Sequence, residues 1–367
     1  MRALLVVRPS VGDVRGGDAA VAEHAADALR ARGVQADIAA SLTPDARGYD
    51  VAHVFGIFDP DVAERQVEAL RRSGAALVIS PIWWDRTALF CLGPLVARVL
   101  SAGRPRGVQQ RLARLRRDEA KLVRNAGRGA VRHLARQAAL LQRCDVALTA
   151  SMIETFACAR FLGVEDVPYV VAPYGLDDDA FEGTPNPART GVVCVGRLEP
   201  LKNQAMLLFA LRDLDVEITL VGASRDAAYT RLCRRWASPR TQFIERVSDA
   251  ELAALLRGSA VHALPSWGDL PGFVSLEAAA RGARVVAGAR GSEREYLGPD
   301  AAYVDPLDPD AIRAAVVHAL EAPPRGAGDA LDARLRTFRW DAYAERALDA
   351  YTRAVVASGS GEESVPT

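Results

Sequence analysis

Short apolar runs alternate with longer helical stretches along the whole chain, and this pattern starts a second time near the middle of the sequence. Runs such as Val192–Val195 are apolar at every position, as burial on both faces of a sheet requires. Alternation of strands and helices favours parallel sheets with helices on both faces. The second start, at Gly191, therefore predicts two similar doubly wound α/β domains.

The pattern assigns most of the chain to strands or helices. The predicted strands include Ala3–Val7, Val34–Ala39, Asp50–Phe55, Ala75–Ser80, Asp145–Thr149, Tyr169–Ala172, Gly191–Val195, Val216–Val221 and Arg284–Ala287. The predicted helices include Asp18–Arg32, Asp61–Ser73, Ser151–Leu162, Asn203–Leu214, Gly272–Arg281, Pro309–Leu320 and a last one near Trp340–Val356. Asp177–Arg189, with its Gly and Pro residues, is the best candidate for a linker, and we expect Ser358–Thr367 to be disordered.

Length and composition exclude several classes of protein. A length of 367 residues favours two domains. Hydrophobic residues make up 50% of the chain and charged residues 25%, which is typical of a globular protein. Met1–Val7 is too short an apolar run for a signal peptide, and no run approaches the ~18 residues that a membrane span needs. The five cysteines are scattered without a CxxC spacing, so we expect a reduced, cytoplasmic protein without structural zinc.

The segment Arg104–Arg143 is strongly basic although the net charge of the chain is zero. It carries twelve Lys/Arg and two acids, a net charge of +10, so the remainder carries −10. Helical spacing is shown by its apolar residues Leu112, Leu115, Leu122, Val131, Leu134, Ala138 and Leu141. Two interpretations stay open: docking on an anionic membrane surface, where each cation contributes about 1 kcal/mol, and a solvated helix pair. Nucleic-acid binding is disfavoured because no aromatic residues interleave the cations.

Two polar segments of the second half follow predicted strands. The first, Gly196–Asn203, places Arg197 and Lys202 just beyond the strand that ends at Val195. Open parallel sheets bind ligands at the carboxyl ends of their strands. A guanidinium and an ammonium there can neutralise most of a pyrophosphate. Alternatively, the two cations lie on the surface of a turn capped by Asn203.

The second segment, Asp269–Glu277, begins with an acid and a Pro-Gly turn and continues as a helix. The free N–H groups and the dipole of that helix favour an anion, and Gly272 lets a ligand approach the backbone. Glu277 lies five residues further, about 7–8 Å along the helix axis, which suits a phosphate and a ribose diol. Alternatively, Asp269 is a helix cap and Glu277 an exposed acid. The co-occurrence with the two cations favours a nucleotide-diphosphate site.

These segments resemble those of a retaining glycosyltransferase of family 4, whose fold is GT-B. Val195–Asn203 is similar to the family's donor-phosphate motif, and Asp269–Glu277 is similar to its two-acid signature. Gly16-Gly17 resembles the N-terminal glycine loop, and Pro173–Asp177 resembles the segment between the domains.

The resemblance extends over nearly the whole chain and implies two Rossmann-like domains facing a central cleft. An acceptor-side domain would span residues 1–175, including the basic segment 104–143, and a nucleotide-sugar-binding domain would span 176–338. Phe338-Arg339-Trp340 resembles the start of the family's last helix. Residues 339–357 would therefore cross back and pack on the first domain, followed by a tail at 358–367.

The resemblance also implies a role for each matching residue. The donor diphosphate would be held by Gly196, Arg197 and Lys202, and the ribose hydroxyls by Glu277. The transferred sugar would be contacted by Asp269 and by the backbone of Gly272, Phe273 and Val274, while Gly16 and Gly17 would close over donor and acceptor. The implied catalytic set is Arg197, Lys202, Asp269 and Glu277, and the family works without a bound metal or another cofactor.

Three positions depart from the family's pattern. Asp269 is one methylene shorter than the Glu that is usual there, and Tyr174 stands where Asn is usual. Pro81–Asp85 contains no histidine, where the family often places one near the reacting sugar. Trp84 and Asp85 are candidates for the acceptor side. The alternatives are that the tryptophans belong to the core or form an acceptor platform and that Asp85 caps a helix.

Two further polar features favour structural roles. The acids Asp177-Asp178-Asp179 could be taken for a metal-binding cluster, but their place in a linker favours an exposed turn and helix cap. His53, at a strand end, is expected to be a satisfied structural histidine rather than a catalytic one.

The residues and the resemblance together predict an enzyme that moves a sugar from a nucleotide-diphosphate-sugar to an unidentified hydroxyl acceptor, and the resemblance implies retention and the absence of a metal. The product would be a glycan, a glycolipid or a glycosylated metabolite. The alternatives are another sugar-nucleotide enzyme of the same fold, such as an epimerase or phosphorylase, and a non-catalytic nucleotide-binding partner subunit. The expected location is cytoplasmic, with peripheral attachment to the inner face of a membrane if the basic segment binds lipid.

Overall fold

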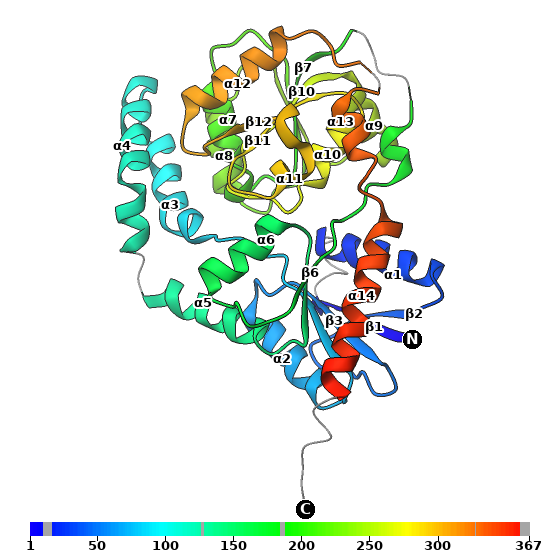
Figure 1. Ribbon diagram of the computed structural model, residues 1–367. Helices are drawn as coiled ribbons and strands as arrows, with labels where there is room; N and C mark the ends of the chain where they lie inside the picture. The colour runs from blue at the N-terminus through cyan, green and yellow to red at the C-terminus, as the bar shows by residue number, and fades with distance from the viewer. Residues whose placement is uncertain (10–16, 126–127, 184–187, 327, 360–367) are drawn as a thin grey trace, which may run out of the picture. The chain divides into compact units, whose positions relative to one another are not determined.

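The computed structural model describes residues 1–9, 17–125, 128–183, 188–326 and 328–359. They form two compact units, each built on a six-stranded parallel sheet with flanking helices (Figure 1). Unit 1 comprises Met1–Asp85, Gly127–Gly175 and Phe338–Thr367, and unit 2 comprises Arg86–Ala126 and Leu176–Thr337. Two doubly wound, Rossmann-like α/β domains confirm the predicted fold class.

Unit 1 has the strand order β2-β1-β3-β4-β5-β6. Its strands are β1 (Arg2–Val7), β2 (Gln35–Ala40), β3 (Val51–Phe55), β4 (Ala76–Ser80), β5 (Val146–Thr149) and β6 (Tyr169–Val171). Its helices are α1 (Gly17–Ala31), α2 (Pro60–Arg71), α5 (Arg128–Leu141), α6 (Met152–Ala157), the π-helical turn η2 (Cys158–Leu162) and α14 (Trp340–Gly359). Helix α2 packs on α5, whereas α14 packs on α1 and on β3 to β6.

Unit 2 has the strand order β12-β11-β10-β7-β8-β9. Its strands are β7 (Thr190–Val195), β8 (Ile218–Val221), β9 (Thr241–Ile244), β10 (Ser259–Leu264), β11 (Arg284–Gly288) and β12 (Ala302–Val304). Its helices are α3 (Thr87–Ser101), α4 (Pro105–Arg124), α7 (Gln204–Leu211), α8 (Ala227–Trp236), α9 (Asp249–Gly258), α10 (Phe273–Ala280), α11 (Glu293–Leu297), α12 (Pro309–Glu321) and α13 (Ala330–Leu335). The 3-10 turns are η3 (Asp178–Phe181), η4 (Pro200–Lys202) and η5 (Gly298–Asp300).

The predicted strands and helices lie within a few residues of those in the structure. The helix expected at Ser151–Leu162 is interrupted, because α6 ends at Ala157 and continues as the π-helical turn η2. Helix α14 runs to Gly359, so the first two residues of the expected tail are helical. The rest of that tail, 360–367, lies outside the described residues.

The basic segment does not stay in one domain, in contrast to the expected boundary. Helix α4 belongs to unit 2 and α5 to unit 1. Val108 and Leu112 of α4 are fully buried in a core cluster that also contains residues of α7 and α8. The apolar side of α4 therefore packs inside unit 2, because burying those side chains removes them from water.

Polar contacts fasten α4 to the same unit. Arg116 forms an ion pair with Asp308, and Glu119 accepts two hydrogen bonds from Arg290, at 2.6 and 3.0 Å. Gln109 Nε2 donates to Asp310 Oδ1 at 2.5 Å.

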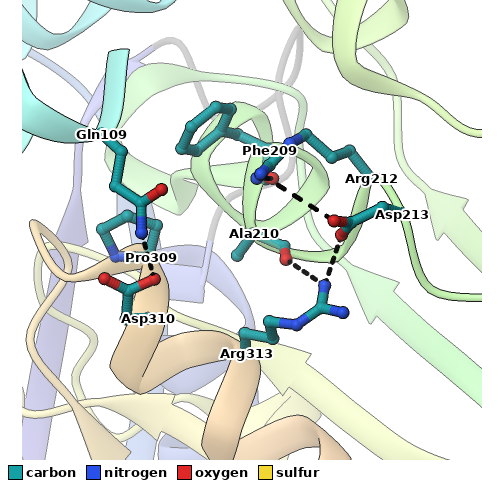
Figure 2. Close-up of a pocket in the computed structure, with 8 residues that line it drawn as sticks. All are labelled: Gln109, Phe209, Ala210, Arg212, Asp213, Pro309, Asp310 and Arg313. Carbon is teal, nitrogen blue, oxygen red and sulfur yellow. Dashed lines mark hydrogen bonds and ion pairs between the residues drawn. The ribbon is translucent and has the colours of Figure 1, made fainter. Parts of the chain in front are cut away.

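Figure 2 shows this last contact at the rim of a pocket of about 190 Å³, between α4, α7 and α12. On the other side of the pocket, Arg313 reaches Ala210 O at 3.1 Å and Asp213 at 2.5 Å. None of the predicted site residues lines this pocket. It marks where α4 is held on unit 2 and is not the predicted donor site.

The chain leaves unit 1 after Gly175 and returns to it at Phe338. These two points lie side by side, because a Cβ on Gly175 would collide with the backbone of Trp340. Tyr174 is buried, with its ring 6.1 Å from that of Trp340 and 5.8 Å from that of Tyr343. The tyrosine that replaces the usual Asn therefore packs the first turns of α14 onto unit 1.

Among the described helices, none combines the length and the apolar character needed to cross a membrane.

Candidate functional site

The first site segment is the loop that follows β7 in unit 2. The chain turns at Gly196, whose φ of +148° is one that residues with a side chain rarely adopt. A Cβ on Gly196 would lie 3.6 Å from the Lys202 stem, so the lysine lies over this turn. The Arg197 side chain is 55% exposed, and its Nη2 lies 3.2 Å from Glu199 Oε1. Both predicted phosphate-binding cations are therefore at the end of β7, Lys202 with 17% of its side chain exposed and Arg197 with more than half.

Asn203 plays a different part from the turn cap that the alternative interpretation assigned to it. Its backbone is left-handed, with a φ of +59°, and its side chain makes no capping hydrogen bond to α7. Instead, its buried Nδ2 donates to Pro265 O at 3.0 Å and to Pro306 O at 2.9 Å. Asn203 thus ties the loop after β7 to the loops after β10 and β12.

The two predicted segments meet in an ion pair. Lys202 Nζ lies 2.5 Å from Asp269 Oδ1, and only 7% of Asp269 is exposed. Burial alone would lower the pKa of Lys202, but the charge and hydrogen bond of Asp269 outweigh it and raise that pKa. Lys202 is therefore a protonated cation that carries Asp269 as its counter-ion. Asp269 is not a helix cap, since Gly272 occupies that position of α10.

Gly272 and the first turn of α10 form the next part of the site. Gly272 has a φ of +77°, and Phe273 and Val274 follow it half-buried at the start of the helix. The Gly272 carbonyl accepts from Ser275 N at 2.8 Å. A Cβ on Gly272 would lie 2.7 Å from Glu293 Oε1, so only glycine fits here.

Glu293, at the first position of α11, is a site residue that the sequence did not reveal. It is fully buried, and its only hydrogen bond among the described residues is a long one, 3.4 Å, from Ser275 Oγ. Gly291 leaves space for the carboxyl group of Glu293, since a Cβ on Gly291 would lie 2.9 Å from Glu293 Oε2. Burial, and then the charge of Asp269, raise the pKa of Glu293 well above its ordinary value. The neutral carboxylic acid is therefore favoured.

Several buried polar atoms of this cluster have no hydrogen-bond partner among the described residues. They are Asp269 Oδ2, Glu293 Oε2, Ser292 Oγ, Ser266 Oγ and both ring nitrogens of His262. Burial lowers the pKa of His262 to about 4, so its ring is neutral at pH 7. Each unmade hydrogen bond of a buried group costs about 1–3 kcal/mol. Such a concentration at the ends of β10 and β11 indicates a place where a polar ligand or water completes the bonding.

Glu277 lies on α10, with its side chain partly buried. Burial is the main cause that raises its pKa to about 7, and the charges of Asp179 and Asp177 add to it. Arg281 opposes these effects. A carboxyl that is half ionised near neutral pH suits a site that receives hydroxyl donors.

Arg86 is a partly buried cation of unit 2 that sequence reasoning did not single out. It directly precedes α3, a helix that packs against η4, and it belongs to unit 2. Burial lowers the pKa of Arg86 to about 10, while Glu199 and Asp269 oppose that shift. The guanidinium therefore remains charged at neutral pH.

The candidates expected in unit 1 are placed as follows. Gly17 begins α1, and Gly16 lies outside the described residues. Trp83 belongs to the core, with Nε1 donating to Gln137 Oε1 at 2.9 Å. Trp84 is half-buried and meets Phe58 edge-on, with ring centroids 4.7 Å apart. Arg86, not Asp85, occupies the cap position of α3.

The two features expected to be structural are also visible. Nδ1 of His53 lies 2.9 Å from Tyr351 OH and Nε2 lies 2.9 Å from Ser80 Oγ, which confirms a satisfied histidine. Asp177-Asp178-Asp179 is exposed at the start of η3. Within the described ranges, no group of three or more His, Cys, Asp or Glu is placed to hold a metal ion.

Comparisons with known proteins place this site in context. Residues 189–322, which contain all the predicted site residues of unit 2, match the family model described as "Glycosyl transferases group 1". The chain is 30% identical over 198 residues to the MMP alpha-(1->4)-mannosyltransferase of Mycolicibacterium hassiacum, covering 50% of this chain and 48% of that one. It is 33% identical over 185 residues to a GDP-mannose-dependent alpha-(1-6)-phosphatidylinositol monomannoside mannosyltransferase of Mycolicibacterium smegmatis, covering 42% and 48%.

The chain thus spans about half the length of the curated relatives it matches. Among solved structures, sucrose-phosphate synthase from Thermosynechococcus elongatus superposes with a TM-score of 0.74 at 18% identity, covering 97% of this chain and 100% of the other. That similarity shows the fold, which is GT-B. The family-model match and the curated relatives support enzyme status for the chain.

Proposed function

We propose that this protein is a retaining glycosyltransferase of family 4 that transfers a sugar from a nucleotide-diphosphate-sugar to a hydroxyl acceptor. The observation that carries the proposal is the meeting of Lys202 and Asp269, 2.5 Å apart, beneath the start of α10. This arrangement joins a phosphate-binding cation to an acid at the carboxyl edge of an open parallel sheet, where such folds bind ligands.

The donor diphosphate would replace Asp269 as the ion-pair partner of Lys202. A diphosphate carries more negative charge than one carboxylate, so it competes well for a buried ammonium. As the glycosidic bond breaks, charge develops on the leaving diphosphate, and Lys202 with the exposed Arg197 would stabilise it. No resident metal is then needed for this step, because side-chain cations supply the positive charge.

Asp269, released from Lys202, would accept a hydrogen bond from a hydroxyl of the transferred sugar. Its Oδ2 already lacks a partner among the described residues. The start of α10 at Gly272 would leave room for the sugar beside the backbone N–H groups of Phe273 and Val274. Glu277, further along the same helix, would accept hydrogen bonds from the ribose diol.

In this proposal the candidate acceptor contacts are residues of unit 1, namely Trp84, Asp85, Gly16 and Gly17. One of the two similar mannosyltransferases acts, by its name, on phosphatidylinositol monomannoside. A hydroxyl-bearing sugar or glycolipid is the acceptor class that these likenesses favour.

Two variants test the donor site. Lys202→Ala and Glu277→Ala should each abolish turnover of the nucleotide-sugar while the fold, checked by circular dichroism, persists. A thermal-shift panel of UDP, GDP and other nucleoside diphosphates should identify the base, since a ligand at a hundredfold excess over Kd stabilises by about 2.7 kcal/mol. Wild-type rates in both variants would show that the site is assigned wrongly. The absence of any stabilising nucleotide would remove the proposed donor class.

We also propose peripheral attachment to the inner face of a membrane through α4, by charge alone. The exposed cations of α4 include Arg106, Arg111, Arg117 and Lys121, whereas its apolar side is buried in unit 2. Insertion of an apolar face is therefore not part of this proposal, and each cation near an anionic surface would contribute about 1 kcal/mol. Co-sedimentation with anionic vesicles should be lost at high salt. Equal recovery with neutral vesicles would contradict it.

A further inference from the structure

The chain leaves space for the buried carboxyl group of Glu293 in unit 2. Two glycines border this group: a Cβ on Gly272 would lie 2.7 Å from Oε1, and a Cβ on Gly291 would lie 2.9 Å from Oε2. Among the described residues, the carboxyl group has one long hydrogen bond, 3.4 Å from Ser275 Oγ, and Oε2 has none. A fully buried acid with so few partners does not stabilise the ligand-free fold.

The same carboxyl group lies beside the backbone of Asp269. The Cβ position of Gly291 that is close to Glu293 Oε2 is also 2.6 Å from Asp269 N. Ser292 N donates to Asp269 O at 3.0 Å, which joins the loop after β11 to the loop after β10. Each acid keeps one buried oxygen without a partner among the described residues, Asp269 Oδ2 and Glu293 Oε2. These two oxygens therefore belong to neighbouring residues of one site.

The two carboxyl groups differ in protonation. Asp269 forms an ion pair with Lys202, 2.5 Å from Nζ to Oδ1, so it is the carboxylate of the two. Burial, and then the charge of Asp269, raise the pKa of Glu293 well above its ordinary value and keep it a neutral acid. Since Ser275 Oγ donates to Oε1, the acid proton of Glu293 is on Oε2. Glu293 thus offers an O–H donor, and Asp269 offers an acceptor.

We propose that Glu293 is a positioning residue of the donor site, whose carboxylic acid group donates a hydrogen bond to Asp269 when the donor diphosphate replaces Asp269 at Lys202. This role rests on the proposed function, in which that replacement occurs. A buried carboxylate that has lost its cation is strongly unfavourable. A hydrogen bond from a carboxylic acid to a carboxylate is charge-assisted and roughly twice as strong as a neutral one.

This hydrogen bond also leaves Asp269 able to act on the sugar. A carboxylate has about four acceptor positions, so Asp269 can accept from Glu293 and from a hydroxyl of the transferred sugar together. The hydrogen bond from Glu293 would fix the orientation of the Asp269 carboxylate once Lys202 no longer does so. Glu293 itself needs no contact with the sugar or the diphosphate for this role.

A positioning role and a purely structural role predict different effects of removing the acid. Methionine is similar in size to glutamate and lacks its hydrogen-bonding group, so Glu293→Met removes a buried and poorly paired carboxyl group. Such a replacement is nearly neutral or stabilising in the ligand-free protein. The ligand-bound protein would instead lose the hydrogen bond to Asp269. A residue that only held the two loops together would lower stability and binding alike.

The test uses four variants of the full chain: Glu293→Met, Glu293→Gln, Asp269→Asn and the double variant Glu293→Met/Asp269→Asn. Glutamine keeps an uncharged hydrogen-bond donor at the same position, and Asp269→Asn removes the charge that Glu293 would stabilise. Isothermal titration calorimetry with inorganic pyrophosphate, UDP, GDP and ADP measures binding, and urea unfolding measures the stability of the ligand-free protein. The double variant completes a cycle that isolates the coupling between the two acids.

Glu293→Met should bind pyrophosphate and the preferred nucleoside diphosphate about tenfold to a hundredfold more weakly, the range of one charge-assisted hydrogen bond. Its urea midpoint should equal or exceed that of wild type. Glu293→Gln should bind within about threefold of wild type. In the Asp269→Asn background, Glu293→Met should have no further effect on binding.

Four results would each overturn the inference alone. They are unchanged binding in Glu293→Met, a lowered urea midpoint or a failure to fold in that variant, an equal loss of binding in Glu293→Gln, and the same loss in the Asp269→Asn background. A wild-type protein that binds none of these diphosphates overturns the proposed function and the inference with it.

Discussion

Each unit contains its own six-stranded parallel sheet with a buried histidine, but the two histidines differ in their hydrogen bonding. His53 on β3 and His262 on β10 are both fully buried. Both ring nitrogens of His53 have partners at 2.9 Å, Tyr351 OH and Ser80 Oγ. Neither nitrogen of His262 has a hydrogen-bond partner among the described residues. The buried histidine of unit 1 is therefore fully hydrogen-bonded, whereas the ring nitrogens of the buried histidine of unit 2 have no partner among the described residues.

Buried glutamates repeat the contrast. Glu154 of unit 1 accepts hydrogen bonds from Trp83 N at 2.8 Å and Ala150 N at 2.7 Å. Glu293 of unit 2 has one long contact, from Ser275, and its Oε2 has no partner in the described part of the chain. His53 and Glu154 of unit 1 are thus held by hydrogen bonds, whereas His262 and Glu293 of unit 2 keep polar atoms without a partner among the described residues. Such unsatisfied buried atoms are what mark the candidate site in unit 2.

The largest effect is expected at the Lys202–Asp269 pair. Lys202→Met should destabilise the protein by about 3–5 kcal/mol, because it leaves a buried carboxylate without its cation. Adding Asp269→Asn should recover most of that stability but no donor turnover. Arg71→Met in unit 1 is the matched control, since the Arg71–Asp145 pair is partly exposed and should lose about 1 kcal/mol or less. Urea unfolding measures all three, and equal losses in the two units would break the comparison.

Glu277 should give the next largest effect, through pH. Its pKa of about 7 in the folded protein lies above the ordinary 4.5, so the stability it contributes is full below about pH 4.5 and is lost as the pH rises through 7. Glu277→Gln should therefore stabilise the ligand-free protein at pH 8.5, by about 3 kcal/mol, and not at pH 4.5.

Nucleotide binding should depend on Glu277 in the opposite sense. The ionised carboxylate is the better acceptor for the ribose diol, so affinity should rise between pH 6.5 and 8.5 in wild type and stay flat in Glu277→Gln. Calorimetric titration with the preferred nucleoside diphosphate measures this. The same pH profile in both proteins would rule out Glu277 as the ribose ligand.

A smaller effect separates the two histidines directly. His53→Phe should destabilise the protein by about 1–3 kcal/mol, because Tyr351 OH and Ser80 Oγ lose their shared partner. His262→Phe removes no hydrogen bond seen in the described residues and should be nearly neutral in the ligand-free protein. Thermal unfolding of both variants provides the measurement, and equal losses would show that His262 is satisfied.

The smallest effects are expected where the units resemble each other, at the ion pairs of their outer helices. Arg116 of α4 pairs with Asp308 in unit 2, and Arg136 of α5 pairs with Asp61 and Glu64 in unit 1. All these side chains are partly or largely exposed. Arg116→Ala and Arg136→Ala should each cost less than about 1 kcal/mol in thermal unfolding experiments. A loss above about 2 kcal/mol in only one of the two variants would show that the units also differ in the ion pairs of their outer helices.

Much of the fold was predictable from the sequence because local patterns carry it. Short, β-branched apolar runs such as Val192–Val195 favour a sheet covered on both faces, and glycines such as Gly163 end helices. The sequence did not reveal which unit contains Arg86–Ala126. An amphipathic pattern predicts a helix with an apolar face, but it does not indicate which surface covers that face. Val108 and Leu112 would fit the core of either unit, and only the tertiary structure decides.

The site was predictable to the extent that its residues follow strands. Arg197, Lys202, Asp269 and Glu277 stand in segments that a parallel sheet brings to one edge. Glu293 was missed because an acid near a helix start is common on protein surfaces, and its burial depends on Gly272 and Gly291 leaving space. Arg86 was not singled out because it is far from the other cations in sequence.

The contact between Gly175 and Trp340 has a consequence for synthesis of the chain. Residues 176–337, the larger part of unit 2, run between two points of unit 1, Gly175 and Phe338-Arg339-Trp340, that lie next to each other. A ribosome completes all of unit 2 before it delivers α14, which supplies Tyr351 to His53 and covers one face of the first sheet. Unit 2 is thus complete at a stage of synthesis when unit 1 still lacks α14.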